Sequence, residues 1–391
     1  MSEKRLRIAV ISDLHCDPSN EKDTYLTTDK LRTPANDHPV ESLLEIINKD
    51  KLTVDLTLCP GDFTNKSNKQ GFISGWGFSI EISQKLKSKD IIATIGNHDV
   101  DVYGTSSNYS FTNAKGIKRD FPIKDENKRD IFWSKGCTFV EEDEYRILVI
   151  NSSHFHHNEA SSHVGEISDD GIQYIKDYLN NLNDDKIQIA LSHYPPVSHP
   201  RNKLGEDDKI LGGEDLLNIL GENNFDLFIY GHKHDPFIKY HNTTVGNNRL
   251  TLFSSGSFSA GTNLMFTSTR NSFHIIDIFK VNKKSKGKIS TWTFKPNDGW
   301  KIFLDESAFA PISGFGNEKS VDEIFESVDV ILKDKNQLTW EEITSMVDDI
   351  NNLIPEDSKK LHELFRKNNY QTDEHLWKGP SKIYNLKKLL Q

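Results

Sequence analysis

The chain has 391 residues and a formal net charge of −10, with 35% hydrophobic and 27% charged residues. This length is enough for one large domain and a smaller one, at roughly 100–200 residues per domain. No stretch reaches the ~18 consecutive apolar residues of a membrane-spanning helix, and the acidic balance argues against a protein that coats duplex DNA with a broad basic face. A phosphate ligand is not excluded, because divalent cations can supply local positive charge.

Cysteine usage and the N-terminal segment bear on the cellular compartment. Cys16, Cys59 and Cys137 are scattered, odd in number and without CxxC spacing, which argues against a disulfide framework or a thiolate metal site. Residues 1–7 are charged, lead straight into a strand-like run and contain no apolar stretch of the signal-peptide type. We therefore expect a protein of the reducing cytoplasm.

Residues 7–230 contain short apolar runs rich in β-branched residues, each ending in polar residues or glycine. Such runs predict buried strands. They are Arg7–Ile11, Val54–Leu58, Ile91–Ile95, Arg146–Ile150, Ile187–Leu191 and Phe225–Tyr230. Segments with apolar residues at helical spacing lie between them, for example 40–47 and 172–179. This alternation of strands and helices predicts an α/β core.

Three later apolar runs follow one another without helical spacers. They are Arg249–Phe253, Ser272–Phe279 and Ile289–Phe294, and they predict an antiparallel or mixed sheet that closes the domain.

The pattern changes after residue 315. Capping-box patterns at 320–323 and 339–342 each precede a helical stripe of apolar residues, and Pro355 stands where a third helix would begin. We therefore predict a large domain over 1–315 and a small helical appendage over 316–391.

Five polar clusters in the larger domain each follow a predicted strand. They are Asp13-Leu14-His15, Gly61-Asp62, Gly96-Asn97-His98-Asp99, His193 and Gly231-His232-Lys233-His234. In an open α/β sheet, ligands bind outside the carboxyl ends of the strands. The clusters are therefore expected to meet at one edge, although more than two hundred residues separate the first from the last.

The residue types in these clusters indicate metal binding. Asp13 and His15 are two positions apart, so on an extended backbone both project from one face, and the same holds for His232 and His234. Carboxylate, imidazole and amide donors without thiolate suit Mn, Fe, Zn or a similar ion. The candidate donors are Asp13, His15, Asp62, Asn97, His193, His232 and His234. Seven are too many for a single ion that must keep a water, whereas two divalent ions that share a bridging carboxylate use them all.

The clusters, in this order and spacing, resemble the motif series of the calcineurin-like metallophosphoesterases, over about residues 6–294. The resemblance implies two packed mixed β-sheets flanked by helices. It assigns Asp13, His15 and His234 to one metal, and Asn97, His193 and His232 to the other, with Asp62 as the bridge. It further implies hydrolysis of a phosphate ester by a metal-bridging hydroxide.

The same resemblance identifies His98 as the catalytic histidine. We expect His98 to protonate the leaving oxygen or to hold the phosphate in the transition state, and Asp99 to orient His98 or keep it protonated.

Two neighbouring residues narrow the substrate class. The protein phosphatases of the family carry an Asp-Arg pair where this chain has Asn65 and Lys66, and these cannot reproduce a carboxylate–guanidinium pair. That departure argues against a protein phosphatase. The run Cys59–Asn65 resembles instead the phosphodiesterase and small-substrate branches of the family. This resemblance leads us to predict a phosphodiesterase acting on a nucleotide or other small organic phosphate. A metal-dependent nuclease is the alternative, although nuclease relatives often carry a histidine just after the Gly-Asp cluster, where this chain has Phe63. A non-catalytic scaffold of the same fold is a remote alternative, because no ligand is substituted.

Two further regions are open to more than one interpretation. His154, His156, His157 and His163 lie in a polar segment, which we interpret as a solvated loop over the mouth of the site rather than a third metal site. The C-terminal helices are interpreted as a packing extension or dimer contact, with recruitment of a protein partner or of nucleic acid as the alternative.

Overall fold

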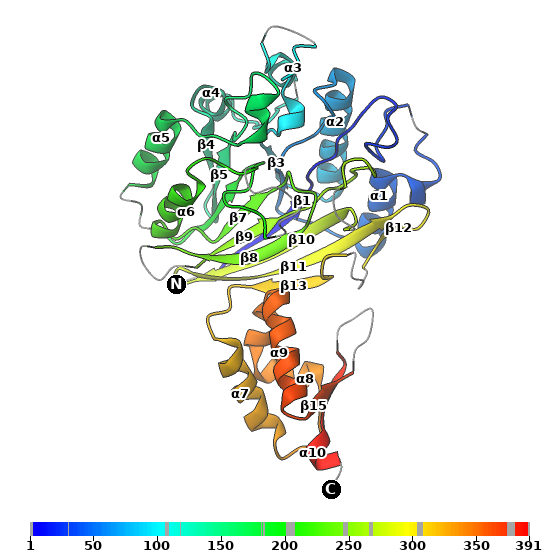
Figure 1. Ribbon diagram of the computed structural model, residues 1–391, viewed down its shortest axis with the longest axis vertical. Coiled ribbons are helices and arrows are strands. Elements are labelled where there is room, and N and C mark those ends of the chain that lie inside the picture. The colour runs from blue at the N-terminus through cyan, green and yellow to red at the C-terminus, as the bar shows by residue number, and fades with distance from the viewer. Residues whose placement is uncertain are drawn as a thin grey trace.

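The computed structural model describes residues 3–389 except 30, 106–108, 118, 181, 183, 201–207, 245–248, 266–268, 303–307 and 374–379. Two mixed β-sheets are stacked face to face and flanked by helices, and a smaller unit with its own helices lies beyond them (Figure 1). The predicted fold class is therefore confirmed. None of the described helices is both long and apolar enough to cross a membrane.

The first sheet has the order β12-β11-β10-β1-β2-β3, with β13 paired to β11. Its strands are β1 Lys4–Val10, β2 Leu56–Cys59, β3 Asp90–Ala93, β10 Ser272–Val281, β11 Lys284–Lys295, β12 Gly299–Lys301 and β13 Ile312–Phe315. Strands β1, β2 and β3 are parallel, whereas β10 runs antiparallel to both β1 and β11. The carboxyl ends of β1, β2 and β3 therefore lie at the same edge.

The second sheet has the order β4-β5-β6-β7-β9-β8. Its strands are β4 Cys137–Glu141, β5 Tyr145–Ile150, β6 Ile187–Leu191, β7 Leu227–Tyr230, β8 Phe237–Asn242 and β9 Arg249–Ser254. The run β5-β6-β7-β9 is parallel. Arg249–Phe253 was predicted to close the domain together with the two strands after it. Instead, β9 pairs with β7 in the second sheet, and the chain then crosses to the first sheet for β10 and β11.

Apolar side chains fill three layers around the two sheets. Between the sheets, residues such as Ile8 and Leu58 meet Ile189 and Ile229. The outer face of the first sheet packs against α1 (Pro39–Asp50) and α2 (Lys69–Lys85), and that of the second against α5 (Asp169–Leu179) and α6 (Gly213–Glu222). Figure 1 shows these two helix pairs on opposite flanks. The remaining helices of this part are α3 Thr112–Gly116 and α4 Glu126–Lys135, with 3-10 turns at Ala35–Asp37, Asn97–Asp99 and Ala160–His163.

The C-terminal part has its own apolar core, which includes Ile324, Ile343 and Phe365. Its elements are α7 Val321–Leu332, β14 Gln337–Thr339, α8 Trp340–Met346, a 3-10 turn at Asp348–Asn352, α9 Pro355–Lys367, β15 Tyr370–Thr372, β16 Lys382–Asn385 and α10 Leu386–Leu389. The two capping boxes and the proline at the start of α9 are present as predicted. The small antiparallel sheet β14-β16-β15 was not predicted, because strands of three or four residues carry almost no periodic pattern.

The C-terminal part contacts the first sheet beside β13. The N–H of Gly314 donates to the Leu353 carbonyl at 2.9 Å. Lys319 pairs with Asp349 at 2.7 Å, and Lys286 on β11 lies 3.7 Å from the same carboxylate.

Candidate metal centre

The seven donor residues predicted from the sequence lie together at one edge of the two sheets. Each follows the carboxyl end of a parallel strand: Asp13 and His15 follow β1, Asp62 follows β2, Asn97 follows β3, His193 follows β6, and His232 and His234 follow β7. The cluster therefore draws on three strands of the first sheet and two of the second. Because the sheets are stacked, the loops that follow the three strands of the first sheet lie next to the loops that follow the two strands of the second.

One half of the cluster is made by Asp13, His15, Asp62 and His234. Their ligand atoms all lie within 4.8 Å of one another, and the four residues are buried. The Nε2 atoms of His15 and His234 are 2.8 Å apart, and His234 Nε2 lies 3.2 Å from Asp13 Oδ1. The Oδ2 atom of Asp62 lies 3.6 Å from His15 Nε2.

The other half is made by Asn97, His193 and His232. Asn97 Oδ1 lies 3.0 Å from His193 Nε2 and 3.1 Å from His232 Nδ1, and these two ring nitrogens are 3.2 Å apart. His193 Nε2 is also 3.4 Å from Asp62 Oδ2. The same carboxylate oxygen thus faces both halves of the cluster, where it could be shared between two ions.

These spacings fit divalent cations. Ions with bonds of about 2.0–2.2 Å to nitrogen and oxygen place neighbouring ligands roughly 3.0–3.5 Å apart. Most of the contacts above fall in this range. Two of them join nitrogen to nitrogen, an arrangement that a cation between the atoms stabilises. The donor set of carboxylate, imidazole and amide oxygen suits Mn, Fe or Zn.

The donors differ in protonation before a cation binds. Burial opposes protonation of His193, but Asp62 outweighs it and raises the pKa of His193 to about 9, so a cation must displace a proton from this ring. Burial lowers the pKa of His15 well below its ordinary value, and neighbouring imidazoles add to that effect, so the ring is neutral as a metal ligand must be. Burial opposes ionisation of Asp62, but His193 outweighs it and holds the pKa of this carboxyl well below its ordinary value. Asp62 is therefore available as a carboxylate.

Backbone hydrogen bonds orient two of the rings. His193 Nδ1 donates to the Pro60 carbonyl at 3.0 Å, and His234 Nδ1 donates to the Leu264 carbonyl at 2.6 Å. Each bond fixes the ring so that Nε2 points into the cluster, a common arrangement of metal-binding histidines.

The backbone at the cluster departs from the extended conformation assumed in the sequence analysis. Five of the seven donor residues have φ between 49° and 70°: Asp13, His15, Asp62, His232 and His234. Non-glycine residues rarely adopt this left-handed conformation, and residues that do so concentrate at functional sites. The chain turns sharply at each strand end, and this turn directs the side chains into the cluster.

Glycine next to the donors leaves space for them. A Cβ at Gly96 would collide with Asp62 Oδ1, and one at Gly231 would collide with Asp13 Oδ2. The glycines of the sequence clusters therefore serve the packing of the carboxylates.

His98 lies beside the cluster and is half-buried. Its ring meets the His15 ring edge to face, with centroids 4.7 Å apart. His98 Nδ1 is 3.1 Å from Asn65 Oδ1, and Asn65 Nδ2 donates to Asp23 Oδ2 at 2.8 Å. Because the Asn65 amide nitrogen is bonded to Asp23, its oxygen is left to accept from His98. The Lys66 N–H makes a longer contact of 3.4 Å to the same ring nitrogen.

Asp99 does not lie where the sequence analysis expected it. Its carboxylate accepts hydrogen bonds from the N–H groups of Asp62, Phe63, Thr64 and Gly96, at 2.8–3.2 Å. It therefore joins the loops after β2 and β3, whereas Asn65 is the residue that contacts the His98 ring. The expectation that Asp99 orients His98 is corrected on these contacts. Adjacency in sequence was a poor guide because the 3-10 turn at Asn97–Asp99 sends the two side chains in different directions.

Asp208 is a neighbour of the cluster that the sequence did not reveal. Its Oδ2 atom lies 3.4 Å from His232 Nε2 and 2.7 Å from Lys233 Nζ. A carboxylate behind a metal-binding imidazole orients the ring and increases its basicity. Asp208 lies in a polar stretch with no motif around it, so nothing local distinguished it.

The histidines of 154–163 lie outside this cluster. His156 is buried and its Nε2 bonds to the Val164 carbonyl at 2.9 Å, whereas His157 and His163 are exposed. Among the described residues, the one close grouping of His, Cys, Asp or Glu ligands is that of Asp13, His15, Asp62 and His234.

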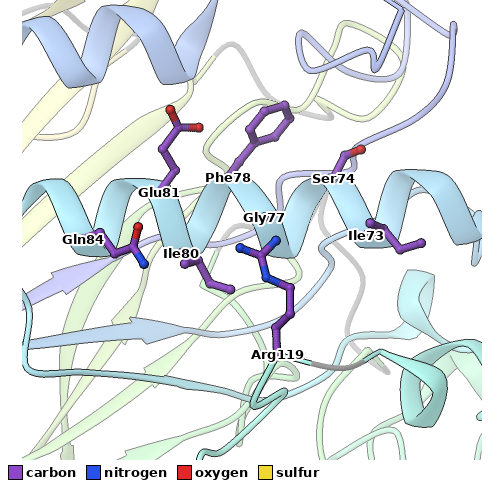
Figure 2. Close-up of a pocket in the computed structure, with 8 residues that line it drawn as sticks. All are labelled: Ile73, Ser74, Gly77, Phe78, Ile80, Glu81, Gln84 and Arg119. Carbon is purple, nitrogen blue, oxygen red and sulfur yellow. The ribbon is translucent and has the colours of Figure 1, made fainter.

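A separate cavity of about 370 Å³ lies along α2 (Figure 2). Ile73, Phe78 and Glu81 line it from the helix, and Arg119 reaches toward Gly77 from a neighbouring loop. Its lining contains none of the seven donor residues.

Comparison with known proteins identifies the family. The model of the calcineurin-like phosphoesterase family matches residues 6–236, more than half of the chain. The chain belongs to the calcineurin-like phosphoesterase family. It is accordingly a metal-dependent hydrolase of phosphate esters, with two divalent metal ions as its cofactor.

A second family model, described as wHTH-Calcineurin_assc, matches residues 313–364. The C-terminal part accordingly contains a winged helix-turn-helix domain. Its element order of helix, strand, two helices and two further strands agrees with that description.

Solved structures of similar fold include a dimetal phosphatase from Danio rerio and a purple acid phosphatase from yellow lupin seeds. The first is 13% identical, with 74% of this chain and 99% of that chain covered and a TM-score of 0.45. The second is 14% identical, with 75% and 53% covered and a TM-score of 0.48. No match was found among curated proteins.

Proposed function

We propose that this protein is a phosphodiesterase that hydrolyses a nucleotide or other small organic phosphate. The observation that carries the proposal is the convergence of six donors, in two sets of three, around the Asp62 carboxylate. Asn97, His98 and His232 are each half-buried, in contrast to the buried remainder of the cluster, so a substrate could approach from this side.

Asp13, His15 and His234 are proposed to hold one metal ion, and Asn97, His193 and His232 the other, with Asp62 shared between them. Bound ions of this kind lower the pKa of water toward neutrality and stabilise negative charge on phosphoryl oxygens. The task of the chain is to keep the donors in place, and the hydrogen bonds of His193 and His234 to backbone carbonyls support that role.

His98 is proposed to donate a proton to the leaving oxygen of the ester. Its Nδ1 atom bonds to Asn65, so we assign proton transfer to Nε2. Asn65 and Asp23 form a hydrogen-bonded relay that fixes the ring, which makes Asn65 the proposed positioning residue. Asp99 is proposed to act indirectly, by bracing the loops that carry Asp62 and His98.

The preference for a small diester is supported by the residues at 65 and 66. A neutral amide at Asn65 contacts His98, and Lys66 follows it where the protein phosphatases of the family carry arginine. A direct test compares turnover of a chromogenic phosphodiester, a chromogenic monoester, and labelled single-stranded and duplex DNA, all with added Mn²⁺. We expect the diester to be turned over fastest. Faster cleavage of DNA would favour a nuclease instead, and inertness towards all four would contradict the proposal.

The C-terminal winged helix-turn-helix domain is proposed to contact a protein partner or a second copy of the chain, and residues 316–391 are proposed to form one structural unit. Val330 on α7 and Met346 on α8 are exposed apolar residues. Acidic residues outnumber basic ones in this part of the chain, which argues against binding to nucleic acid. Size-exclusion chromatography with light scattering tests whether the protein forms a dimer. A monomeric mass at micromolar concentration would exclude contact with a second copy, and a different protein would then be the proposed partner.

A cytoplasmic location is proposed because of the state of the three cysteines. Cys16, Cys59 and Cys137 are free and buried, as expected in a reducing compartment.

A further inference from the structure

A second cavity lies between two loops that the proposed chemistry does not use. It measures about 410 Å³, within the range of small-molecule sites. Tyr109 and Phe111 line it from the segment after β3, and Phe155 and His156 line it from the loop after β5. Ser110 Oγ donates to the His156 carbonyl at 2.8 Å, which joins the two sides.

This cavity is adjacent to the metal centre. The His156 ring lies edge to face against Tyr194, with centroids 5.6 Å apart, and the Tyr194 ring lies 4.1 Å from that of His232. On the other side, the lining residue Asp101 is three positions beyond His98. A single ring therefore separates the cavity wall from a proposed metal ligand.

Exposed aromatic rings gather at this cavity. Within the described chain, the aromatic residues that are exposed rather than buried or half-buried are Tyr103, Tyr109 and Phe155, at 51%, 50% and 40%. Tyr109 and Phe155 line the cavity, and Tyr103 is next to the lining residue Gly104. Exposed apolar surface is unfavourable in water, so the gathering of these three aromatic rings at one cavity points to a ligand that covers them.

Aromatic rings line both sides of the cavity. His154 and Phe155 meet edge to face at 5.1 Å, and Tyr109 lies tilted against Phe111 at 5.8 Å. Lys115 Nζ lies 5.3 Å from the centre of the Tyr109 ring. Aromatic side chains on two facing loops can stack on the faces of a flat heterocycle.

We propose that this cavity binds the nucleobase of the substrate while the phosphate lies at the metal centre. The inference rests on the proposed function, because it names the organic part of the ester hydrolysed there. Tyr109 and Phe155 are the residues that would select it.

Binding tests the cavity without turnover. Adenosine 5′-monophosphate and ribose 5-phosphate share the sugar and the phosphate and differ in the base. Their affinities are measured by equilibrium dialysis with Mn²⁺-loaded protein carrying His98→Ala, which keeps the ligands intact. We expect the nucleotide to bind about tenfold or more tightly, and the advantage to disappear when Tyr109→Ala and Phe155→Ala are added.

The matched control is Ile73→Ala, an exposed apolar residue in the cavity along α2 (Figure 2). It should keep the preference for the base. Equal affinity for the two ligands would overturn the inference, as would equal loss of the preference in the control.

Turnover separates this inference from the proposed function. The p-nitrophenyl ester of thymidine 5′-phosphate and methyl p-nitrophenyl phosphate are diesters with the same leaving group. We expect kcat/KM to be higher for the nucleotide ester, and the ratio to approach one in the Tyr109→Ala, Phe155→Ala protein. Hydrolysis of neither ester, with the base preference in binding intact, would contradict the proposed function and support the cavity assignment.

Discussion

His98 and Asp62 have different tasks at the residue scale, although both lie within one cluster. Asp62 faces donors on both sides through a single oxygen, whereas His98 touches the cluster through the edge of its ring. Removal of the Asp62 side chain should therefore reduce metal binding, whereas removal of the His98 side chain should reduce the rate of hydrolysis.

His98→Ala is expected to retain the metal content of the wild type and to lose roughly 10²–10⁴-fold in kcat, the usual contribution of a general acid. Elemental analysis and steady-state turnover of a chromogenic diester measure the two quantities. His163→Ala, an exposed histidine away from the cluster, is the control. A wild-type rate of turnover in His98→Ala would contradict the assignment of His98 as the general acid.

Gly96→Ala should weaken metal binding without removing any ligand. The new Cβ would displace Asp62 Oδ1 and the His193 ring, which belong to both halves of the cluster. Gly116→Ala is the matched control, because a Cβ there meets no atom within 4 Å. The measurement is the metal content of each variant after dialysis. Equal metal retention by the two variants would show that the cluster tolerates displacement of Asp62 and His193.

At the scale of elements, an ion network around the buried Arg146 holds the second sheet at the strand ends away from the cluster. Arg146 on β5 is buried and bonds to Glu141 on β4 at 2.8 Å, to Gln188 on β6 at 2.9 Å, and to Asp184. Burial opposes ionisation of Glu141, but the hydrogen bonds from Arg146, Lys186 and Tyr178 outweigh it and lower the pKa of Glu141 to about 2.

Arg146→Met should therefore lower the free energy of unfolding by about 1–3 kcal/mol, because it leaves the buried Gln188 amide and the half-buried Glu141 carboxylate without their hydrogen-bond partner. Urea denaturation measures this. Arg5→Met, which removes an exposed pair with Glu3, should cost less than about 1 kcal/mol. Similar losses in the two variants would mean that the network contributes no more than a surface ion pair.

The strands and helices with strong periodicity could be predicted from the sequence. Ile187–Leu191 coincides with β6, and the predicted caps begin α7 and α8. Membership of β9 in the second sheet could not be predicted, because pairing between distant strands leaves no local pattern. The same limit applies to Asp208 and to the partner of His98, since both depend on which loops the sheets bring together.

At the scale of the whole molecule, stacking of two parallel-strand groups creates the site. Motifs spread from Asp13 to His234 meet because their strands end at a common edge, and this much followed from residue order alone. The sharp backbone turns at the donors could not be predicted from residue order, because Asp and His seldom adopt the left-handed conformation.

The central claim is that one chain binds two divalent ions around Asp62 and that hydrolysis depends on both. Its most direct test is a titration of chelator-treated protein with Mn²⁺, in which calorimetry and diester turnover are followed together, for the wild type and for Asp62→Ala. The account predicts two equivalents per chain, with turnover following occupancy of the second, and loss of both binding and turnover in Asp62→Ala. Full turnover with one equivalent, or two equivalents still bound by Asp62→Ala, would contradict it.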